Sequence, residues 1–309
     1  MREHEQIDWN EDAEGDLRRL VQLAVAEDFG NGQDWTTVSL VPDSVEASAA
    51  IVPREKGVIA GLPAGPIVFD EMECKATCKP LVEDGTVVEP GQQVAILAGP
   101  AREILSAERT ILNVVGYLSG IATQAAKFAE QIGGTNAKVY DTRKTLPGYR
   151  RLAKYAVRCG GGTNHRAGLH RAVLIKDNHI AFGNDELKND DSIPGFQVAE
   201  AVTISRKFIA ESVDNGAEMI VEIEVDTIQQ LEQVLPSLPD IVLLDNMPPE
   251  QLRKAVAIRD AQAPTVQLEA SGGVNIDTIS AIAKTGVDRI SVGALTHSVR
   301  NFDVGLDWL

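Results

Sequence analysis

The stretch MIVEIEVDTIQQLEQVLPSLPDIVLLDN, residues 219–246, decides the fold class. Its two apolar runs, 219–225 and 241–244, are rich in β-branched residues, and the segment between them, 227–235, is amphipathic. Continuous apolar runs of this kind are typical of parallel strands that are buried on both faces. The stretch therefore predicts one strand–helix–strand unit of an α/β protein.

The same alternation continues on both sides of this unit. Further apolar runs lie at 138–140, 172–175, 265–268 and 289–292, and further amphipathic segments lie at 149–158, 197–213, 249–260 and 276–284. Six such strands make most of a parallel β/α barrel, in which the carboxyl ends of the strands converge on one mouth where active sites are built. We therefore expect functional residues directly after these runs.

The first 130 residues follow a different pattern. Helical spacing begins at Asp16, an N-terminal capping type of residue, and continues to residue 27. Short alternating runs broken by Pro and Gly over 45–99 predict a small strand-rich domain. Residues 101–132 contain no Pro and predict one long helix or a helix pair.

Charge is distributed unevenly along the chain. The 309 residues carry a formal net charge of -16, yet residues 141–180 contain nine Lys or Arg, three His and only two Asp. A general nucleic-acid-binding surface is disfavoured in such an acidic chain, whereas one local basic pocket fits a small anionic ligand.

The chain offers no sign of secretion or membrane insertion. Its acidic N-terminus lacks the basic-then-apolar pattern of a signal peptide, and no apolar run approaches the roughly 18 residues of a membrane helix. Cys74, Cys78 and Cys159 are too few and too scattered for a disulfide framework or a zinc site. We expect a cytoplasmic protein with reduced thiols.

Several cations lie at or near two successive strand ends, where they can line one pocket. They are Arg143, Lys144, His165, Arg166 and Lys176. Arginine offers a planar donor fork that matches a carboxylate, whereas lysine acts as a point charge suited to phosphate. A site with both types indicates a ligand with both groups. We interpret Arg150, Arg151, Lys154 and Arg158 instead as the solvated face of the helix at 149–158.

Glycines follow the last two strands in a pattern typical of a phosphate site. Ser271-Gly272-Gly273 precedes the segment 276–284, and Gly293-Ala294 follows the next strand. Two ordinary strand–helix turns remain the alternative. Gly160-Gly161-Gly162, by comparison, is weak evidence and is also typical of a flexible loop.

Two carboxylates end neighbouring strands in this basic region. Glu224 and Asp245 can hold a hard cation such as Mg²⁺, or accept hydrogen bonds from sugar hydroxyls. His165, His170 and His179 lack the tight spacing of a zinc site, so a zinc hydrolase is a minor hypothesis.

Taken together, these segments resemble the quinolinate phosphoribosyltransferase family, that is, nicotinate-nucleotide pyrophosphorylase (carboxylating). The resemblance rests on DTRKTLPGYRRLAKYAVRCGGGTNHRAGL (141–169), LIKDNH (174–179), VEIEVDT (221–227), LLDNM (243–247), LEASGGV (268–274), ISVGALTHS (290–298), AERTILNVVGYLSGIAT (107–123) and EDFGNGQDWTT (27–37). The motifs occur in the family's order from about residue 20 to about residue 300, and their combination is highly specific.

The resemblance implies a type II phosphoribosyltransferase with two domains. An N-terminal α/β sandwich domain over 1–130, joined by the C-terminal segment 297–309, would accompany an incomplete parallel β/α barrel over 131–296. Such enzymes transfer the phosphoribosyl group of 5-phosphoribosyl 1-pyrophosphate to quinolinate with loss of CO₂, giving nicotinate mononucleotide and pyrophosphate in de novo NAD biosynthesis. They use Mg²⁺ and work as homodimers or higher homo-oligomers with interfacial active sites.

The family's roles can be carried over to matching positions of this sequence. Arg143, His165, Arg166 and Lys176 would hold the quinolinate carboxylates, Thr142 would also contact substrate, and Arg109 would reach in from the partner subunit. Lys144 would face the pyrophosphate, Glu224 and Asp245 would meet the ribose hydroxyls and Mg²⁺, and Ser271, Gly272, Gly273, Gly293 and Ala294 would bind the 5-phosphate. Lys144, Lys176, Glu224 and Asp245 would form the catalytic set.

Two features depart from the family pattern. Lys176 and Glu224 are 48 residues apart because of a polar insertion at 181–197, which is a surface loop or a lid. Arg171 stands where the family usually has an acidic residue. The rival interpretations are a nicotinate phosphoribosyltransferase, a molybdate-transport-associated relative, a type I phosphoribosyltransferase and a barrel that binds a metabolite without catalysis.

Overall fold

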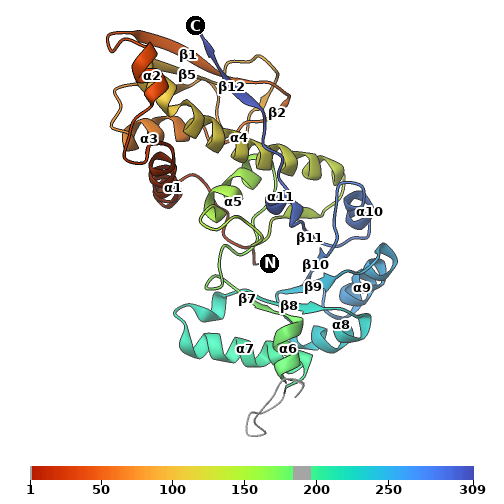
Figure 1. The fold of residues 1–309 in the computed structure, drawn as a ribbon. Coiled ribbons are helices and arrows are strands. Elements are labelled where there is room, and N and C mark those ends of the chain that lie inside the picture. The colour runs from red at the N-terminus through yellow and green to blue at the C-terminus, as the bar shows by residue number, and fades with distance from the viewer. Residues whose placement is uncertain (1, 184–195) are drawn as a thin grey trace. The chain divides into compact units, whose positions relative to one another are not determined.

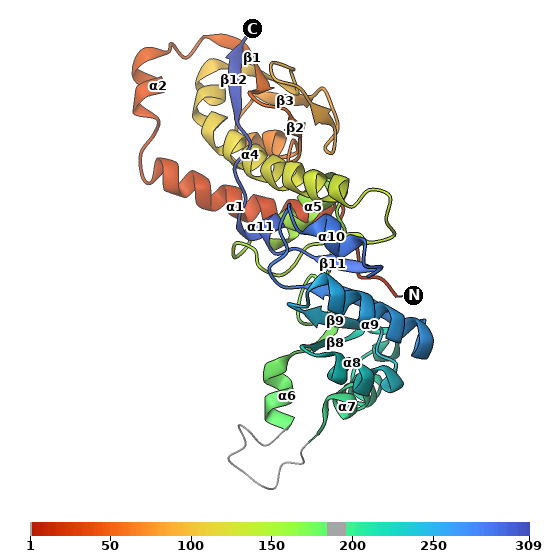
Figure 2. The same ribbon diagram turned by 90° about the vertical axis from the view of Figure 1, so that its right-hand side faces the viewer.

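The computed structural model describes residues 2–183 and 196–309, so the inserted loop predicted at 181–197 lies mostly outside the described residues. The chain divides into two compact units. The first, the barrel unit, comprises Met1–Glu5, Phe128–Arg143 and Thr163–Ala294, and the second, the sandwich unit, comprises Gln6–Lys127, Lys144–Gly162 and Leu295–Leu309. Each unit is drawn in Figures 1 and 2.

The barrel unit contains one parallel sheet of six strands in the order β6-β11-β10-β9-β8-β7. The strands are β6 (Lys138–Tyr140), β7 (Val173–Ile175), β8 (Val221–Val225), β9 (Ile241–Asp245), β10 (Gln267–Ser271) and β11 (Arg289–Ser291). All six predicted strands are therefore confirmed. The sheet ends at β6 and β7, and an isolated parallel bridge joins Tyr140 to Thr163. The result is the incomplete barrel that was predicted.

Helices follow the strands of this sheet. They are α6 (Asp177–Gly183), α7 (Val198–Ser212), α8 (Ile228–Val234), α9 (Pro249–Gln262), α10 (Ile279–Ala283) and α11 (Ala294–His297). Helix α8 begins with a capping box, in which Thr227 accepts a hydrogen bond from the backbone N–H of Gln230 while the Gln230 side chain accepts one from the Thr227 N–H. In both views α7, α8 and α9 lie beside the strands β8 and β9 (Figures 1 and 2).

The sandwich unit is built on an antiparallel sheet in the order β12-β1-β5-β3. Its strands are β1 (Glu46–Pro53), β3 (Thr77–Pro80), β5 (Ala95–Pro100) and β12 (Val304–Trp308), and β2 (Gly57–Val58) pairs separately with β4 (Val87–Val88). The helices are α1 (Glu11–Phe29), α2 (Trp35–Leu40), α3 (Ala64–Glu71), α4 (Ala101–Gln131) and α5 (Arg150–Cys159). Residues 101–131 thus form one long helix rather than a pair. None of the helices in the described part of the chain is long and apolar enough to cross a membrane.

Two local predictions on α1 and α5 were wrong. Helix α1 begins five residues before Asp16, because Asn10 caps it by accepting a hydrogen bond from the Ala13 N–H at 3.0 Å. Asp16 instead accepts a hydrogen bond from Nε of Arg151 at 3.0 Å. Lys154 is fully buried rather than solvated, since α5 turns its residues 152–154 inward. The long aliphatic part of a lysine can pack in this way while its amine is partnered.

Asp84 organises the turn before β4. Its carboxylate accepts hydrogen bonds from the N–H groups of Gly61 (2.7 Å) and Leu62 (3.1 Å) and from the Tyr155 hydroxyl (2.8 Å). Because substitution by alanine removes the acceptor for all three donors, we expect Asp84→Ala to lower the free energy of unfolding by about 2–4 kcal/mol in chemical denaturation. Glu83→Ala, at the exposed neighbour, should change it by less than about 0.5 kcal/mol. Equal effects of the two substitutions would contradict this account.

Candidate active site

Two arginines of the barrel unit lie close enough to repel each other. Arg143 follows β6 by three residues, and Arg166 belongs to the segment that joins the sheet through the bridge at Thr163. Burial and the positive charge of Arg143 both lower the pKa of the Arg166 guanidinium. In each arginine the Nε atom is buried and has no hydrogen-bond acceptor among the described residues. Two such donors side by side form a receptor for an anion.

The backbone of this segment is held by a buried carboxylate. Asp141, which is fully buried, accepts hydrogen bonds from the His165 N–H at 2.8 Å and from the Asn164 side-chain amide at 2.7 Å. The Arg166 guanidinium in turn donates from Nη1 to the carbonyl oxygen of Ala172 at 2.9 Å. Asp141 therefore positions His165, which was predicted to bind substrate, together with its neighbour Asn164, a role that its place at a strand end did not reveal.

His165 lies in the interior of the barrel unit. Its Nε2 is 3.1 Å from Oε2 of Glu222 and 3.5 Å from Oε1 of Glu269, and its Nδ1 accepts the N–H of Arg166 at 2.8 Å. Burial opposes the charged form, but the two carboxylates raise the pKa of His165 above its ordinary value. Both ring nitrogens thus have protein partners, and direct contact of His165 with a substrate carboxylate stays a prediction.

Glu222 is a site residue that the sequence interpretation missed. It is fully buried, whereas the side chain of Glu224, on the same strand at its end, is 10% exposed. Successive side chains of a strand point to opposite faces, so residues two apart share one face. The alternation in VEIEV therefore places Glu222 next to Glu224 on one side of β8, and this signal was available in the sequence.

The negative charge of Glu269 is balanced by a buried arginine. Arg289 donates from Nε to Oε2 of Glu269 at 2.6 Å, and its guanidinium lies 3.6 Å from the centroid of the Tyr140 ring. Burial raises the pKa of Glu269, but the charges of His165 and Arg289 outweigh it and hold that pKa below the ordinary value. The carboxylate therefore stays ionised inside the barrel unit.

Lys176, Glu224 and Asp245 form a second group at the strand ends. The Nζ atom of Lys176 donates to Oε2 of Glu224 at 2.6 Å. Burial raises the pKa of Glu224, Lys176 lowers it and the charge of Asp245 raises it, with a net increase. Two hard oxygen donors that repel each other fit a divalent cation such as Mg²⁺. β8 links this group to the arginine group, because it carries Glu222 and Glu224 two residues apart.

The glycine pair after β10, which is predicted to bind phosphate, has left-handed backbone conformations. Gly272 and Gly273 both have positive φ values, +92° and +60°. A side chain at Gly272 would collide with Asn246, so only glycine fits there, whereas nothing lies near the Cβ position of Gly273. Ser271 accepts the N–H of Asn246 at 2.9 Å through its carbonyl oxygen. The segment predicted as a helix at 276–284 is helical only over α10, after a turn closed by Asn275 and Thr278.

The remaining predicted residues are distributed over both units. Gly293 precedes α11 and Ala294 begins it, and Thr142 lies between Asp141 and Arg143 in the barrel unit. In the sandwich unit, Lys144 lines a pocket with Tyr117 and His297, and Arg109 is exposed on α4. An exposed position is what a residue requires to act on a neighbouring subunit.

Comparison with known proteins decides the family. Residues 34–119 match the N-terminal domain, and residues 121–307 the C-terminal domain, of quinolinate phosphoribosyl transferase. The chain belongs to the quinolinate phosphoribosyltransferase family. The two matches together cover both units and include every predicted site residue.

Individual relatives agree with this membership. The chain is 44% identical to the nicotinate-nucleotide pyrophosphorylase [carboxylating] of Mycobacterium leprae, over 96% of this chain and 99% of that protein. It is 36% identical to the probable enzyme of the same name from Bacillus subtilis, over 94% and 93% of the two chains. The solved nicotinate-nucleotide pyrophosphorylase of Francisella tularensis has a TM-score of 0.86 at 37% identity, over 99% and 100%. A human nicotinic acid phosphoribosyltransferase, 14% identical with a TM-score of 0.59, shares the fold alone.

Proposed function

We propose that this protein transfers the phosphoribosyl group of 5-phosphoribosyl 1-pyrophosphate to quinolinate, with loss of CO₂, in NAD biosynthesis. The observation that carries the proposal is the pair of guanidiniums of Arg143 and Arg166, each with a buried Nε that lacks an acceptor among the described residues. A pyridine dicarboxylate offers two planar anionic groups, which match two arginine forks. Family membership supports the same substrate.

A single ring carboxylate is a weaker match for this pair. Nicotinate would supply one anionic group and would leave one guanidinium beside another without a counter-charge. An unpaired buried charge of this kind is costly. The two arginines therefore favour quinolinate over nicotinate, which is the nearest rival substrate.

The residues of the site have distinct parts in the proposed reaction. Arg143, Arg166 and Lys176 hold and align the dianion, so that its ring nitrogen attacks C1 of the ribose as pyrophosphate leaves. The ring nitrogen becomes positively charged, and this charge stabilises the carbanion that remains when the neighbouring carboxylate departs as CO₂. Protonation of that carbon completes nicotinate mononucleotide.

Glu224 and Asp245 are the proposed holders of Mg²⁺, which when bound neutralises the pyrophosphate charge. The same carboxylates can accept hydrogen bonds from the ribose hydroxyls. Gly272 and Gly273 would present backbone N–H groups to the 5-phosphate, together with Ser271, Gly293 and Ala294, and Lys144 would face the pyrophosphate. The cytoplasmic location stays a prediction.

Product analysis tests the proposed function. The purified protein is incubated with quinolinate, 5-phosphoribosyl 1-pyrophosphate and Mg²⁺, and nicotinate mononucleotide and ¹⁴CO₂ are followed, with nicotinate as the parallel substrate. Formation of product from quinolinate and not from nicotinate would support the proposal. Product from nicotinate alone, or from neither substrate, would reject it.

We further propose a homodimer in which Arg109 completes the site of the partner subunit. Arg109→Ala and Arg166→Ala should each be nearly inactive, but co-expression of the two variants should restore about a quarter of the active sites, because half of the dimers are mixed and carry one intact site. Different affinity tags on the two chains allow the mixed dimers to be isolated. The measurement is the activity of these mixed dimers, each of which should have one active site of its two. Mixed dimers as inactive as either parent would place Arg109 in the site of its own chain.

A further inference from the structure

The chain's first residues belong to the barrel unit, although residues 6–127, which follow them, belong to the sandwich unit. Arg2 donates to the carbonyl oxygens of Ala217 (2.8 Å) and Met219 (3.3 Å), which precede β8. Glu3 accepts the Tyr140 hydroxyl at 2.7 Å, and Glu5 pairs with Arg171 at 3.1 Å. The segment Arg2–Glu5 is therefore fixed on both sides of His4.

These contacts place the segment at the amino ends of the strands. Lys138 and Arg289, the first residues of β6 and β11, both form ion pairs with Glu3 at 3.2 Å. Asp240, which directly precedes β9, forms an ion pair with Arg2 at 3.5 Å. The predicted ligand residues Glu224, Asp245 and Ser271 lie at the opposite ends of their strands. Arg2–Glu5 thus lies at the amino ends of these strands, opposite to the ends that carry the predicted ligand residues.

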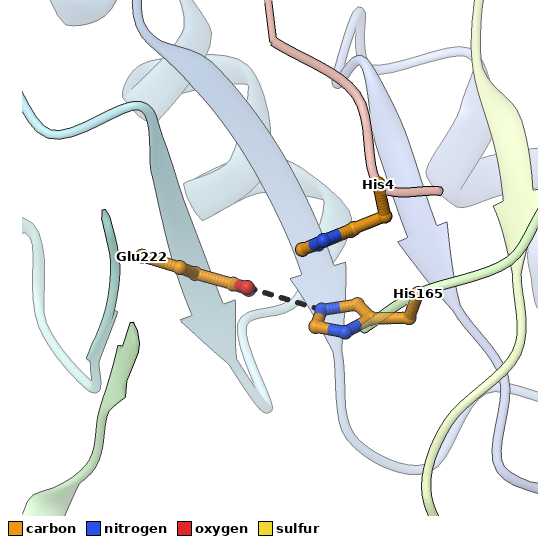
Figure 3. A group of neighbouring side chains, drawn as sticks. All are labelled: His4, His165 and Glu222. Carbon is orange, nitrogen blue, oxygen red and sulfur yellow. Dashed lines mark ion pairs between the residues drawn. The ribbon is translucent and has the colours of Figure 1, made fainter. Parts of the chain in front are cut away.

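His4 reaches from this segment to the residue behind the arginine pair. Its side chain is 5% exposed, and its ring packs on the ring of His165 with centroids 4.5 Å apart and planes inclined by 33°. Figure 3 shows His4 and Glu222 approaching the same imidazole, His4 across its face and Glu222 at its Nε2. His165 is thus held by a ring contact from the N-terminal segment and an ion pair from β8.

A bound metal ion is not the best explanation of this group. Donor atoms of His4, His165 and Glu222 lie within 4.8 Å of one another, a spacing that a metal could bridge. However, Nδ1 of His165 accepts the Arg166 N–H and Nε2 lies 3.1 Å from Glu222, so both ring nitrogens already have protein partners. A proton directed at Glu222 explains the 3.1 Å contact without a metal.

His165 transmits this support to the substrate site through one hydrogen bond. Its Nδ1 accepts the Arg166 N–H, and therefore the orientation of the imidazole fixes the backbone from which the Arg166 guanidinium extends. Glu222 is fully buried, and its 3.1 Å contact with Nε2 of His165 offsets the cost of burying its carboxylate. Displacement of the His165 ring would disturb both partners.

We propose that His4 is a positioning residue for quinolinate binding, which acts by packing on His165 and thereby fixing Arg166. The inference rests on the proposed function and extends it to the N-terminal segment. When a residue that binds the substrate is displaced by about 1 Å, activity can fall by about 100-fold. Removal of the His4 ring should therefore weaken binding of the dicarboxylate and leave binding of 5-phosphoribosyl 1-pyrophosphate unchanged.

The test compares His4→Ala with His4→Phe, which keeps an aromatic ring against His165 but no ring nitrogen. We expect His4→Ala to raise the KM for quinolinate by about 10- to 100-fold with little change in the KM for 5-phosphoribosyl 1-pyrophosphate. His4→Phe should return the KM for quinolinate close to the wild-type value. His170→Ala, the same change at an exposed histidine, should resemble wild type in both constants.

Three outcomes would overturn the inference. A wild-type KM for quinolinate in His4→Ala would show that the ring contact does not matter for binding. A parallel rise in the KM values for both substrates in His4→Ala, accompanied by a lower Tm, would show a general structural role. If His4→Phe were as impaired as His4→Ala, packing of the ring would be excluded as the cause. If His4→Ala is insoluble, the Phe variant and His4→Gln are compared in the same way. Absence of turnover in the wild-type protein would instead reject the proposed function itself.

Discussion

Arg166→Ala is expected to lower kcat/KM for quinolinate by about 10²- to 10³-fold, the loss typical for removal of one preorganised charged donor from an active site. The guanidinium lies beside that of Arg143, and its Nε has no acceptor among the described residues. An anion bound there gains a charge-assisted hydrogen bond and relieves the repulsion between the two arginines. Both gains disappear with the side chain, and steady-state kinetics with quinolinate as the varied substrate measures the loss.

Two further variants test whether the loss of activity comes from the planar guanidinium, from its positive charge or from misfolding. Arg166→Lys keeps the positive charge but not the planar fork, so it should recover only a small part of the lost activity. Arg253→Ala makes the same change at an exposed arginine of α9, and its kcat/KM should stay near the wild-type value. Full activity of Arg166→Ala, at an unchanged Tm, would remove Arg166 from the site.

Arg289→Met is expected to lower the free energy of unfolding by about 3–5 kcal/mol, the usual cost of removing one partner of a buried ion pair. The Arg289 and Glu269 side chains are 1% and 0% exposed, and 2.6 Å separates their nearest charged atoms. Without the guanidinium, Glu269 would remain buried with only His165 to offset its charge, and Tyr140 would lose its contact with the cation. Urea denaturation followed by circular dichroism measures the change.

The double variant Arg289→Met/Glu269→Met distinguishes an uncompensated charge from a loss of packing. If the charge dominates, the double variant should be more stable than Arg289→Met alone, because no unpaired carboxylate remains. Arg253→Met, at an exposed arginine of α9, should change the free energy of unfolding by less than about 0.5 kcal/mol. A single variant as stable as wild type would show that this pair adds no net stability.

The sequence alone determined the barrel strands and predicted most of the proposed ligand set. Six apolar runs between amphipathic segments predicted β6 to β11, because parallel strands buried on both faces require continuous apolar residues. Since the carboxyl ends of such strands share one edge, the sequence predicts that Glu224, Asp245 and the glycines at 272–273 belong to one site. The two-residue period of β8 also contained the signal for Glu222.

Only the tertiary structure decided what lies behind the arginine pair. His4 and His165 are far apart in the sequence, as are Glu269 and Asp141, and no local period links them. Burial of Lys154 likewise depended on how α5 packs, because a lysine with an exposed amine and one with a partnered amine have the same sequence pattern. Local spacing specifies strands and helices, whereas contacts between distant segments follow from how those elements close around a shared interior.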